Sequence, residues 1–272
     1  MSHSSLSPQE MLASLWRNRF LILSLTKREV IGRYRGSILG LFWSFFNPLF
    51  MLGVYTFVFS VVFQARWGGG TGSKVEFALI LFAGLIIFNM FAECFNRAPY
   101  LILGNVNYVK KVIFPLEILP WVVLGSALFH AVISLSVWLI AYMVFFGLPH
   151  PTLVFLPLVF APLSLFTLGV CWALASLGVY LRDVGQVVAI MTSVFMFLSP
   201  IFYPVTALPP NYRPLLWLNP LMPAIEQIRA VLFWGRFPDW GLLGIYWLGS
   251  SLAAWIGFVW FQKTRKGFAD VL

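Results

Sequence analysis

The chain has 272 residues, of which 60% are hydrophobic and only 10% are charged, whereas an ordinary soluble domain is about 25% charged. A soluble fold of this length could not bury so much apolar surface. The composition therefore predicts an all-α polytopic membrane protein, with a single domain over residues 1–272. The net charge of +9 would suggest nucleic acid in a soluble protein. Membrane proteins, however, collect Lys and Arg on their cytoplasmic side, so we expect no nucleic-acid partner.

The N-terminal segment predicts a helix that lies along the membrane surface. Residues 7–10, Ser-Pro-Gln-Glu, form a capping box with proline at the first helical position, and a second helical segment covers about 20–34. The apolar side chains and a late basic motif are typical of an interfacial amphipathic helix that touches membrane lipids. A simple basic flank without functional contacts is the alternative. The motif consists of Lys27, Arg28, Arg33 and Arg35.

Six apolar segments are predicted to cross the membrane. From Gly36 an uncharged run of 30 residues continues through Ala65, and the 64 positions of 118–181 hold no charged residue and need two crossings. Gly36 and Gly40 are spaced either to let two helices approach closely or to relieve crowding within one bundle. The predicted spans are about 38–63, 77–97, 116–146, 152–180, 186–203 and 240–261.

The distribution of basic residues predicts the orientation. With six crossings, 13 Lys and Arg lie on the side of the two termini and five on the other side. Because cytoplasmic loops carry the excess of Lys and Arg, both termini are expected in the cytoplasm of a cell whose inner membrane holds the protein.

The external segment 204–239 is apolar and rich in proline. Ile225, Ile228, Val231 and Leu232 fall at helical spacing, and Glu226 and Arg229 form an i,i+3 pair that we expect to be exposed. The pattern predicts two short, proline-started helices that dip back into the outer leaflet and close an external gate. A packed external cap is the alternative. The gate residues are Pro209, Pro220, Pro223, Glu226 and Arg229.

The chain lacks the motifs of the main catalytic and cofactor sites. It has no Gly-x-x-x-x-Gly-Lys-Ser/Thr loop for phosphates, so ATP and Mg²⁺ are expected only at a partner ATPase. No His or Cys cluster suggests a metal, and we expect Cys94 and Cys171 to be free thiols. Glu93 and Glu117 are interpreted as structural ion-pair partners, and His130 as a helix-packing group.

Two function classes remain from these residues. One is a transport permease whose energy comes from another chain. The other is a membrane enzyme at the outer leaflet, acting on lipid-linked glycans, whose acid–base groups would come from Arg213, Glu226, Arg229 and Asp239.

Several motifs resemble the polysaccharide-export ABC permeases, which export O-antigen, teichoic acid and capsule chains. They include Thr26-Lys27-Arg28-Glu29, Arg33-Tyr34-Arg35-Gly36-Ser37, Asn47-Pro48-Leu49, Val109-Lys110-Lys111, Arg182-Asp183, Ser199-Pro200-Ile201, Asn219-Pro220 and Glu226-x-x-Arg229. The resemblance spans nearly the whole chain. It implies a homodimer bound to two copies of an ABC ATPase, moving a lipid-linked polysaccharide outward, with O-antigen the first choice.

The same resemblance implies an ATPase docking surface in the loop after span two, where the family places a short helix. The residues are Asn105, Asn107, Val109, Lys110 and Lys111. The basic residues could equally anchor the loop at anionic headgroups.

Aromatic residues make up 18% of the chain, more than two interfacial belts need. Most of them are expected to face lipid or to pack in the bundle. Because sugar C–H faces stack on aromatic rings, we predict a polysaccharide conduit formed by spans one and five, wide enough only in the dimer. Its residues are Tyr55, Phe59, Phe195, Phe197, Phe202 and Tyr203, with Asn47 and Ser199 as further hydrogen-bonding groups.

Overall fold

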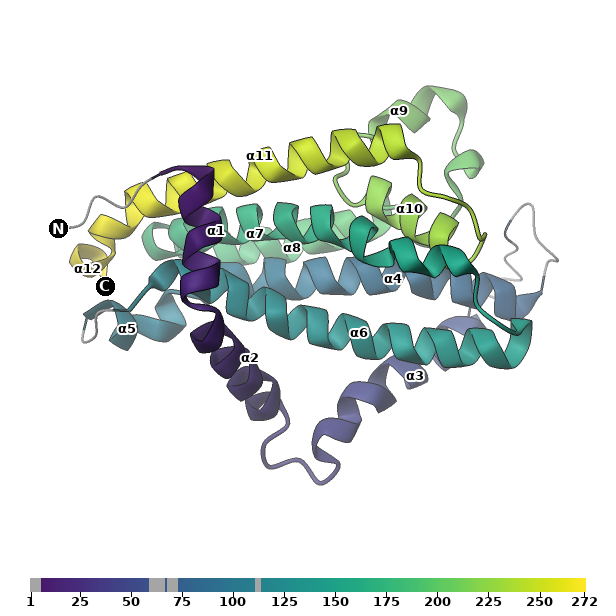
Figure 1. The fold of residues 1–272 in the computed structure, drawn as a ribbon, viewed down its shortest axis with the longest axis horizontal. Coiled ribbons are helices and arrows are strands. Elements are labelled where there is room, and N and C mark those ends of the chain that lie inside the picture. The colour runs from purple at the N-terminus through teal and green to yellow at the C-terminus, as the bar shows by residue number, and fades with distance from the viewer. Residues whose placement is uncertain (1–5, 59–66, 68–72, 111–113) are drawn as a thin grey trace.

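The computed structural model describes residues 6–58, 67, 73–110 and 114–272, and every regular element within these ranges is helical (Figure 1). The all-α class predicted from the composition is confirmed. The α-helices are α1 Pro8–Arg17, α2 Arg19–Arg33, α3 Trp43–Tyr55, α4 Lys74–Arg97, α5 Val106–Lys110, α6 Leu119–Phe146, α7 Leu156–Tyr180, α8 Val184–Leu198, α9 Arg213–Leu216, α10 Met222–Leu232, α11 Trp240–Thr264 and α12 Phe268–Val271.

Five helical segments of the described chain are long and apolar enough to cross a membrane: Gly40–Val58, Lys74–Tyr100, Leu116–Phe146, Pro151–Tyr180 and Trp240–Val271. They correspond to the predicted spans one to four and six. The predicted fifth span contains α8, whose 15 residues reach about 22 Å at the helical rise of about 1.5 Å per residue. That length is shorter than a bilayer core of about 30 Å, so helix length alone does not establish a sixth crossing.

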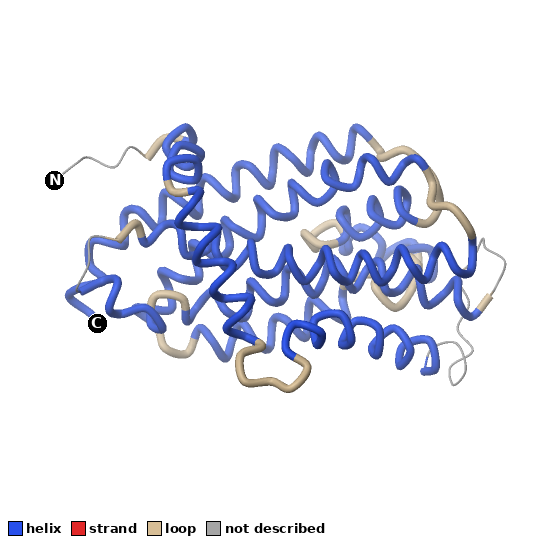
Figure 2. Tube along the Cα trace, turned by 60° about the horizontal axis from the view of Figure 1, so that its bottom comes forward, coloured by secondary structure: helices blue, strands red, loops and turns tan. Residues whose placement is uncertain are grey.

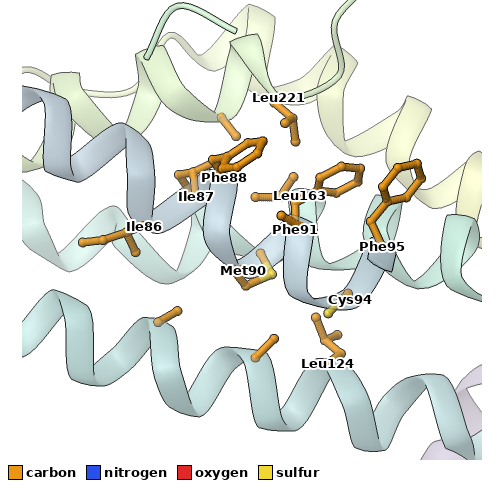
Figure 3. Close-up of a cluster of buried hydrophobic side chains, with 14 of the residues drawn as sticks. Ile86, Ile87, Phe88, Met90, Phe91, Cys94, Phe95, Leu124, Leu163 and Leu221 are labelled. Carbon is orange, nitrogen blue, oxygen red and sulfur yellow. The ribbon is translucent and has the colours of Figure 1, made fainter. Parts of the chain in front are cut away.

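Helix α4 forms the centre of the bundle. In its most apolar stretch 89% of the residues are buried, against 11% in the first span. Figure 3 shows Phe88, Phe91 and Phe95 of α4 beside Leu163 of α7, with Met90 and Cys94 turned toward Leu124 of α6. Because α4 is covered by its neighbours over most of its surface, it is the core around which the other spans pack.

Helices α7 and α11 pack in direct backbone contact. A Cβ atom placed on Gly257 would lie 2.1 Å from the carbonyl oxygen of Gly169, and one on Gly169 would lie 2.4 Å from the carbonyl oxygen of Ala253. Small residues at such a crossing let two helices approach closely in a membrane, where packing replaces the hydrophobic effect.

Helices α2 and α3 form a V at the side of the bundle (Figure 1), and Figure 2 shows their connection as a loop outside it. Gly36 and Gly40 in this loop have positive φ angles of 83° and 50°, a conformation that glycine adopts without the steric cost of a Cβ atom. Neither glycine has another group within 4 Å of its Cβ position. They therefore turn the chain here instead of joining two helices within it, and the first apolar helical segment begins at Gly40, close to the predicted start at about 38.

The elements near the two ends of the chain lie at one end of the bundle. Helices α1, α5 and α12 gather there, whereas α9 and α10 lie toward the other end (Figure 1). The predicted helix start at Ser7 is confirmed, since the Ser7 side chain accepts a hydrogen bond of 3.2 Å from the Glu10 backbone N–H, while the Glu10 carboxylate pairs with Arg17 at 2.8 Å. Cys94 and Cys171 are free and buried, as predicted.

Candidate functional site

A polar cavity of about 740 Å³ lies between the V and the bundle. Residues from the end of α2, from α3, from α4 and from α6 line it. Its volume falls within the range of about 300 to 1,000 Å³ that is typical of small-molecule sites. Tyr55, which the sequence places in the conduit, is one of its lining residues.

The charged end of this cavity is an ion network centred on Glu93. The Glu93 carboxylate forms ion pairs with Arg33 at 2.9 Å and with Arg97 at 3.4 Å, and His130 Nδ1 lies 3.0 Å from the same carboxylate. Arg97 also pairs with Glu29. The network ties α2 to α4 and α6, because charges inside a span are stable only when paired. The structural interpretation of Glu93 is thus confirmed, and His130 is hydrogen-bonded as expected.

The other residues of the basic motif differ in their surroundings. Arg28 donates a hydrogen bond of 2.9 Å to the Tyr108 hydroxyl on α5, whereas Lys27 and Arg35 are exposed. Helix α2 also packs along α6, where the Thr26 hydroxyl donates to the Val122 carbonyl at 3.4 Å. Contacts with lipid remain a prediction for the exposed members of the motif.

A second ion network links the N-terminal segment of the chain to its C-terminal segment. Buried Glu117 pairs with Arg265 at 2.8 Å and accepts a hydrogen bond of 3.3 Å from the Ser14 hydroxyl of α1. The Trp172 indole N–H donates to the Glu117 carbonyl at 3.0 Å. Glu117 therefore has the structural pairing that we predicted, although its partner comes from the C-terminal segment instead of the basic loop.

The segment 204–239 is a packed cap built around one arginine, and the prediction of an exposed Glu226–Arg229 pair is wrong. The Arg229 side chain is 2% exposed and that of Glu226 is 39% exposed. Arg229 donates to the carbonyls of Ile80 at 3.1 Å, Pro200 at 2.5 Å and Ile201 at 2.8 Å, and lies 4.5 Å from the ring centroid of Trp67. The guanidinium is buried because these carbonyl groups replace water around it.

The short helices predicted in the cap are present. Ile225, Ile228, Val231 and Leu232 of α10 are all buried, as their spacing indicated. Pro223 lies in the first turn of α10, Pro209 directly precedes a 3₁₀ turn at Pro210–Tyr212, and Pro220 lies in the turn before α10. The Asn219 amide donates to the Ser199 hydroxyl at 2.8 Å, so the cap is fastened to the end of α8.

The predicted docking residues form a compact helical segment. Asn105 ends a 3₁₀ turn, and Asn107, Val109 and Lys110 belong to α5, where Asn107 and Lys110 are exposed. Lys111 lies outside the described residues. Helix α5 contacts α12, which places this segment at the same end as α1.

The structure brings only part of the predicted conduit set together. Phe195 packs its ring against Phe91 and Phe95 in the core of the protomer. Phe197 is 67% exposed, with its ring 6.2 Å from that of Phe202.

Tyr203 donates hydrogen bonds to the carbonyls of Phe197 and Leu198. Phe59 lies outside the described residues. Within the described residues, α3 and α8 have different neighbours. Tyr55 of α3 lines the cavity beside α4 and α6, whereas α8 packs on α4 and α7.

Sequence reasoning missed Asn89, which is exposed within the otherwise buried helix α4 and lines the polar cavity. A lone amide in an apolar run was the available signal, because a polar group at membrane depth needs a partner or water.

A bundle of helices this long and apolar is that of a multi-pass membrane protein. The chain belongs to the ABC-2 type transporter family, which matches residues 20–233.

Curated relatives resemble the chain along most of their length. The O-antigen export system permease protein RfbA of Myxococcus xanthus is 28% identical, over 96% of this chain and 98% of that protein. RfbA of Klebsiella pneumoniae is 24% identical, over 93% and 95%. The polysialic acid transport protein KpsM of Escherichia coli is 22% identical, over 89% and 92%.

Proposed function

We propose that the protein is the permease subunit of an ABC exporter that moves a lipid-linked polysaccharide out of the cytoplasm, with O-antigen as the first choice. The observation that carries this proposal is the end-to-end similarity to an O-antigen export permease, which extends over 96% of the chain. Teichoic acid and capsule chains are the other substrates that the sequence resemblance implies.

The proposed assembly is a homodimer bound to two ATPase subunits, which bind ATP and Mg²⁺. The ATPase docks at the end of the bundle that holds α1, α5 and α12. Exposed basic residues support this placement, since Lys110 and Lys266 are both accessible there and cytoplasmic surfaces of membrane proteins are rich in Lys and Arg. Both termini are then cytoplasmic, and α8 with the segment after it makes a sixth, short crossing.

In this proposal the packed cap gates the outer end of the path. Its short helices at 205–216 and 222–232 close the path while no polymer passes. The exposed rings of span one and α8, such as Phe197, supply the aromatic contacts of the conduit in the dimer. Weak stacking on rings suits a sliding polymer, because each sugar finds similar contacts at the next position.

The alternative of an outer-leaflet enzyme receives less support. Arg229 is buried and bonded to backbone carbonyls, and Arg213 donates to the carbonyls of Thr206 and Leu208. Asp239 caps α11 through the Leu242 N–H. These groups are engaged in holding the cap, whereas a catalytic set needs side chains that are free to meet a substrate.

Deletion of the gene for this chain tests the proposed function. We expect the surface polysaccharide to disappear and the lipid-linked polymer to accumulate at the inner leaflet, where only permeabilised cells bind a polymer-specific lectin. A plasmid copy should restore the surface polymer. An unchanged amount and length of surface polysaccharide would contradict export. A polymer that reaches the surface with altered composition would favour the enzyme.

Chemical cross-linking tests the docking surface. Asn107→Cys or Val109→Cys, treated with a maleimide–succinimidyl ester reagent, should join the chain to the ATPase subunit, and the buried native cysteines keep the background low. Phe237→Cys is the control, because Phe237 is 68% exposed but lies beside the external cap. Cross-linking of the ATPase at Phe237→Cys and not at Asn107→Cys would reverse the orientation.

A further inference from the structure

The polar cavity contains side chains that the protein itself leaves without partners. Asn47 of α3, Asn89 of α4 and Ser134 of α6 all line it, and among the described residues none of the three has a hydrogen-bonding partner for its side chain. All three lie within segments long and apolar enough to cross a membrane. The cavity thus collects unpaired amide and hydroxyl groups from three different spans.

Such groups are unfavourable in contact with hydrocarbon. Moving an amide from water to an alkane-like environment without a new hydrogen bond is strongly unfavourable. These groups come from three spans, and all of them lie on one concave surface. They do not point into the core of the bundle. The cavity therefore suits water or a ligand that offers many hydrogen-bonding groups.

The charged end of the cavity makes an anion a poor fit. Arg33 is already paired with Glu93 at 2.9 Å, and His130 lies 3.0 Å from the same carboxylate. An incoming phosphate would have to compete with this carboxylate for both donors. The unpaired groups are instead neutral donors and acceptors, which match the hydroxyls of a sugar.

Aromatic rings complete the match with a sugar. Trp43 and Tyr55 of α3 line the cavity together with Asn47. Aromatic rings carry negative charge on their faces, which attracts the positively polarised C–H groups of a sugar ring. A surface of amides and rings offers partners to both the hydroxyls and the C–H faces of a saccharide.

We infer that this cavity is a saccharide-binding site in each protomer, in which Asn47, Asn89 and Ser134 bind sugar hydroxyls and Trp43 and Tyr55 stack on sugar rings. The inference rests on the proposed function, and it differs from the predicted conduit of spans one and five because α4 and α6 supply the walls. Neutral sugar units of the polymer are its ligand. The Glu93 network holds α2 and the closed end of the V in place beside them.

Cysteine labelling tests whether the cavity is hydrated. In inside-out vesicles, Asn89→Cys should react with a charged, membrane-impermeant methanethiosulfonate on the order of ten times faster than a lipid-facing cysteine, because a thiol in apolar surroundings stays protonated. The matched control is Leu248→Cys, since Leu248 is 75% exposed on the apolar helix α11. Equal, slow labelling of both variants would overturn the inference.

Protection from labelling tests the ligand. The probe is the polysaccharide that mild acid releases from the cells that make this protein. It should slow the reaction of Asn89→Cys and of Asn47→Cys. Rapid labelling that the polysaccharide does not slow would show a hydrated cavity without a saccharide site, and would overturn the inference. Failure of the proposed function itself is recognised separately, by normal surface polysaccharide in the deletion strain.

Discussion

Replacing Arg229 with methionine is expected to lower the free energy of unfolding by several kcal/mol, since each buried group left without its hydrogen bond costs about 1 to 3 kcal/mol. The substitution leaves three buried carbonyl groups, those of Ile80, Pro200 and Ile201, without their donor. Methionine fills a similar volume, so the loss reports the hydrogen bonds more than a cavity. Thermal unfolding of the detergent-purified protein measures it.

The matched control is Arg236→Met, the same substitution at an exposed position of the same external segment. We expect it to change stability by less than about 0.5 kcal/mol. Glu226→Gln should also be mild, because its side chain is 39% exposed and an amide oxygen still accepts a hydrogen bond. Unfolding of Arg229→Met at the same temperature as Arg236→Met would show that Arg229 does not hold the cap.

The helical pattern of the cap could be predicted from the sequence, but the environment of its arginine could not. The spacing of Ile225, Ile228 and Val231 is a local property, and all three are buried as it indicated. The acceptors of Arg229 lie 149 residues away at Ile80 and 29 residues away at Pro200. The nearby Glu226 therefore suggested an exposed i,i+3 pair, because local spacing says nothing of such distant partners.

The ends of the spans could also be predicted only in part from the sequence. The predicted spans two, three and four lie within about three residues of apolar helical segments in the structure, since a bilayer requires a continuous apolar helix. The last segment extends to Val271, ten residues beyond the predicted end of span six. At the start of span one, Gly36 and Gly40 adopt positive φ angles and turn the chain. Hydropathy does not distinguish a glycine that turns the chain from one that packs against a helix.

The polar cavity could not be predicted from the sequence, because its residues come from different helices. Asn47 and Asn89 come from different spans, and each looks like an isolated exception in its own apolar run. Glu93 was interpreted as a structural partner for Arg97, which is confirmed, but its contacts with Arg33 and His130 depend on how α2 and α6 pack on α4. Only the packing of the helices makes one site of these residues.

Replacing Gly257 with alanine is expected to destabilise the protein by about 1 to 3 kcal/mol, the usual cost of forcing an extra carbon into a packed core. The added Cβ would lie 2.1 Å from the carbonyl oxygen of Gly169, a backbone atom that cannot rotate away. Helices α7 and α11 would have to separate along their whole crossing. In a membrane this separation loses the close contact on which helix association depends.

The matched control lies on the same helix. Gly249 of α11 has open space at its Cβ position, so Gly249→Ala should stabilise the helix by up to about 1 kcal/mol, because alanine favours helices more than glycine does. The two variants are thus expected to shift the thermal unfolding temperature in opposite directions. Shifts of the same sign and size would mean that the contact between α7 and α11 is looser than the structure shows, and that helix propensity alone decides the effect of alanine in α11.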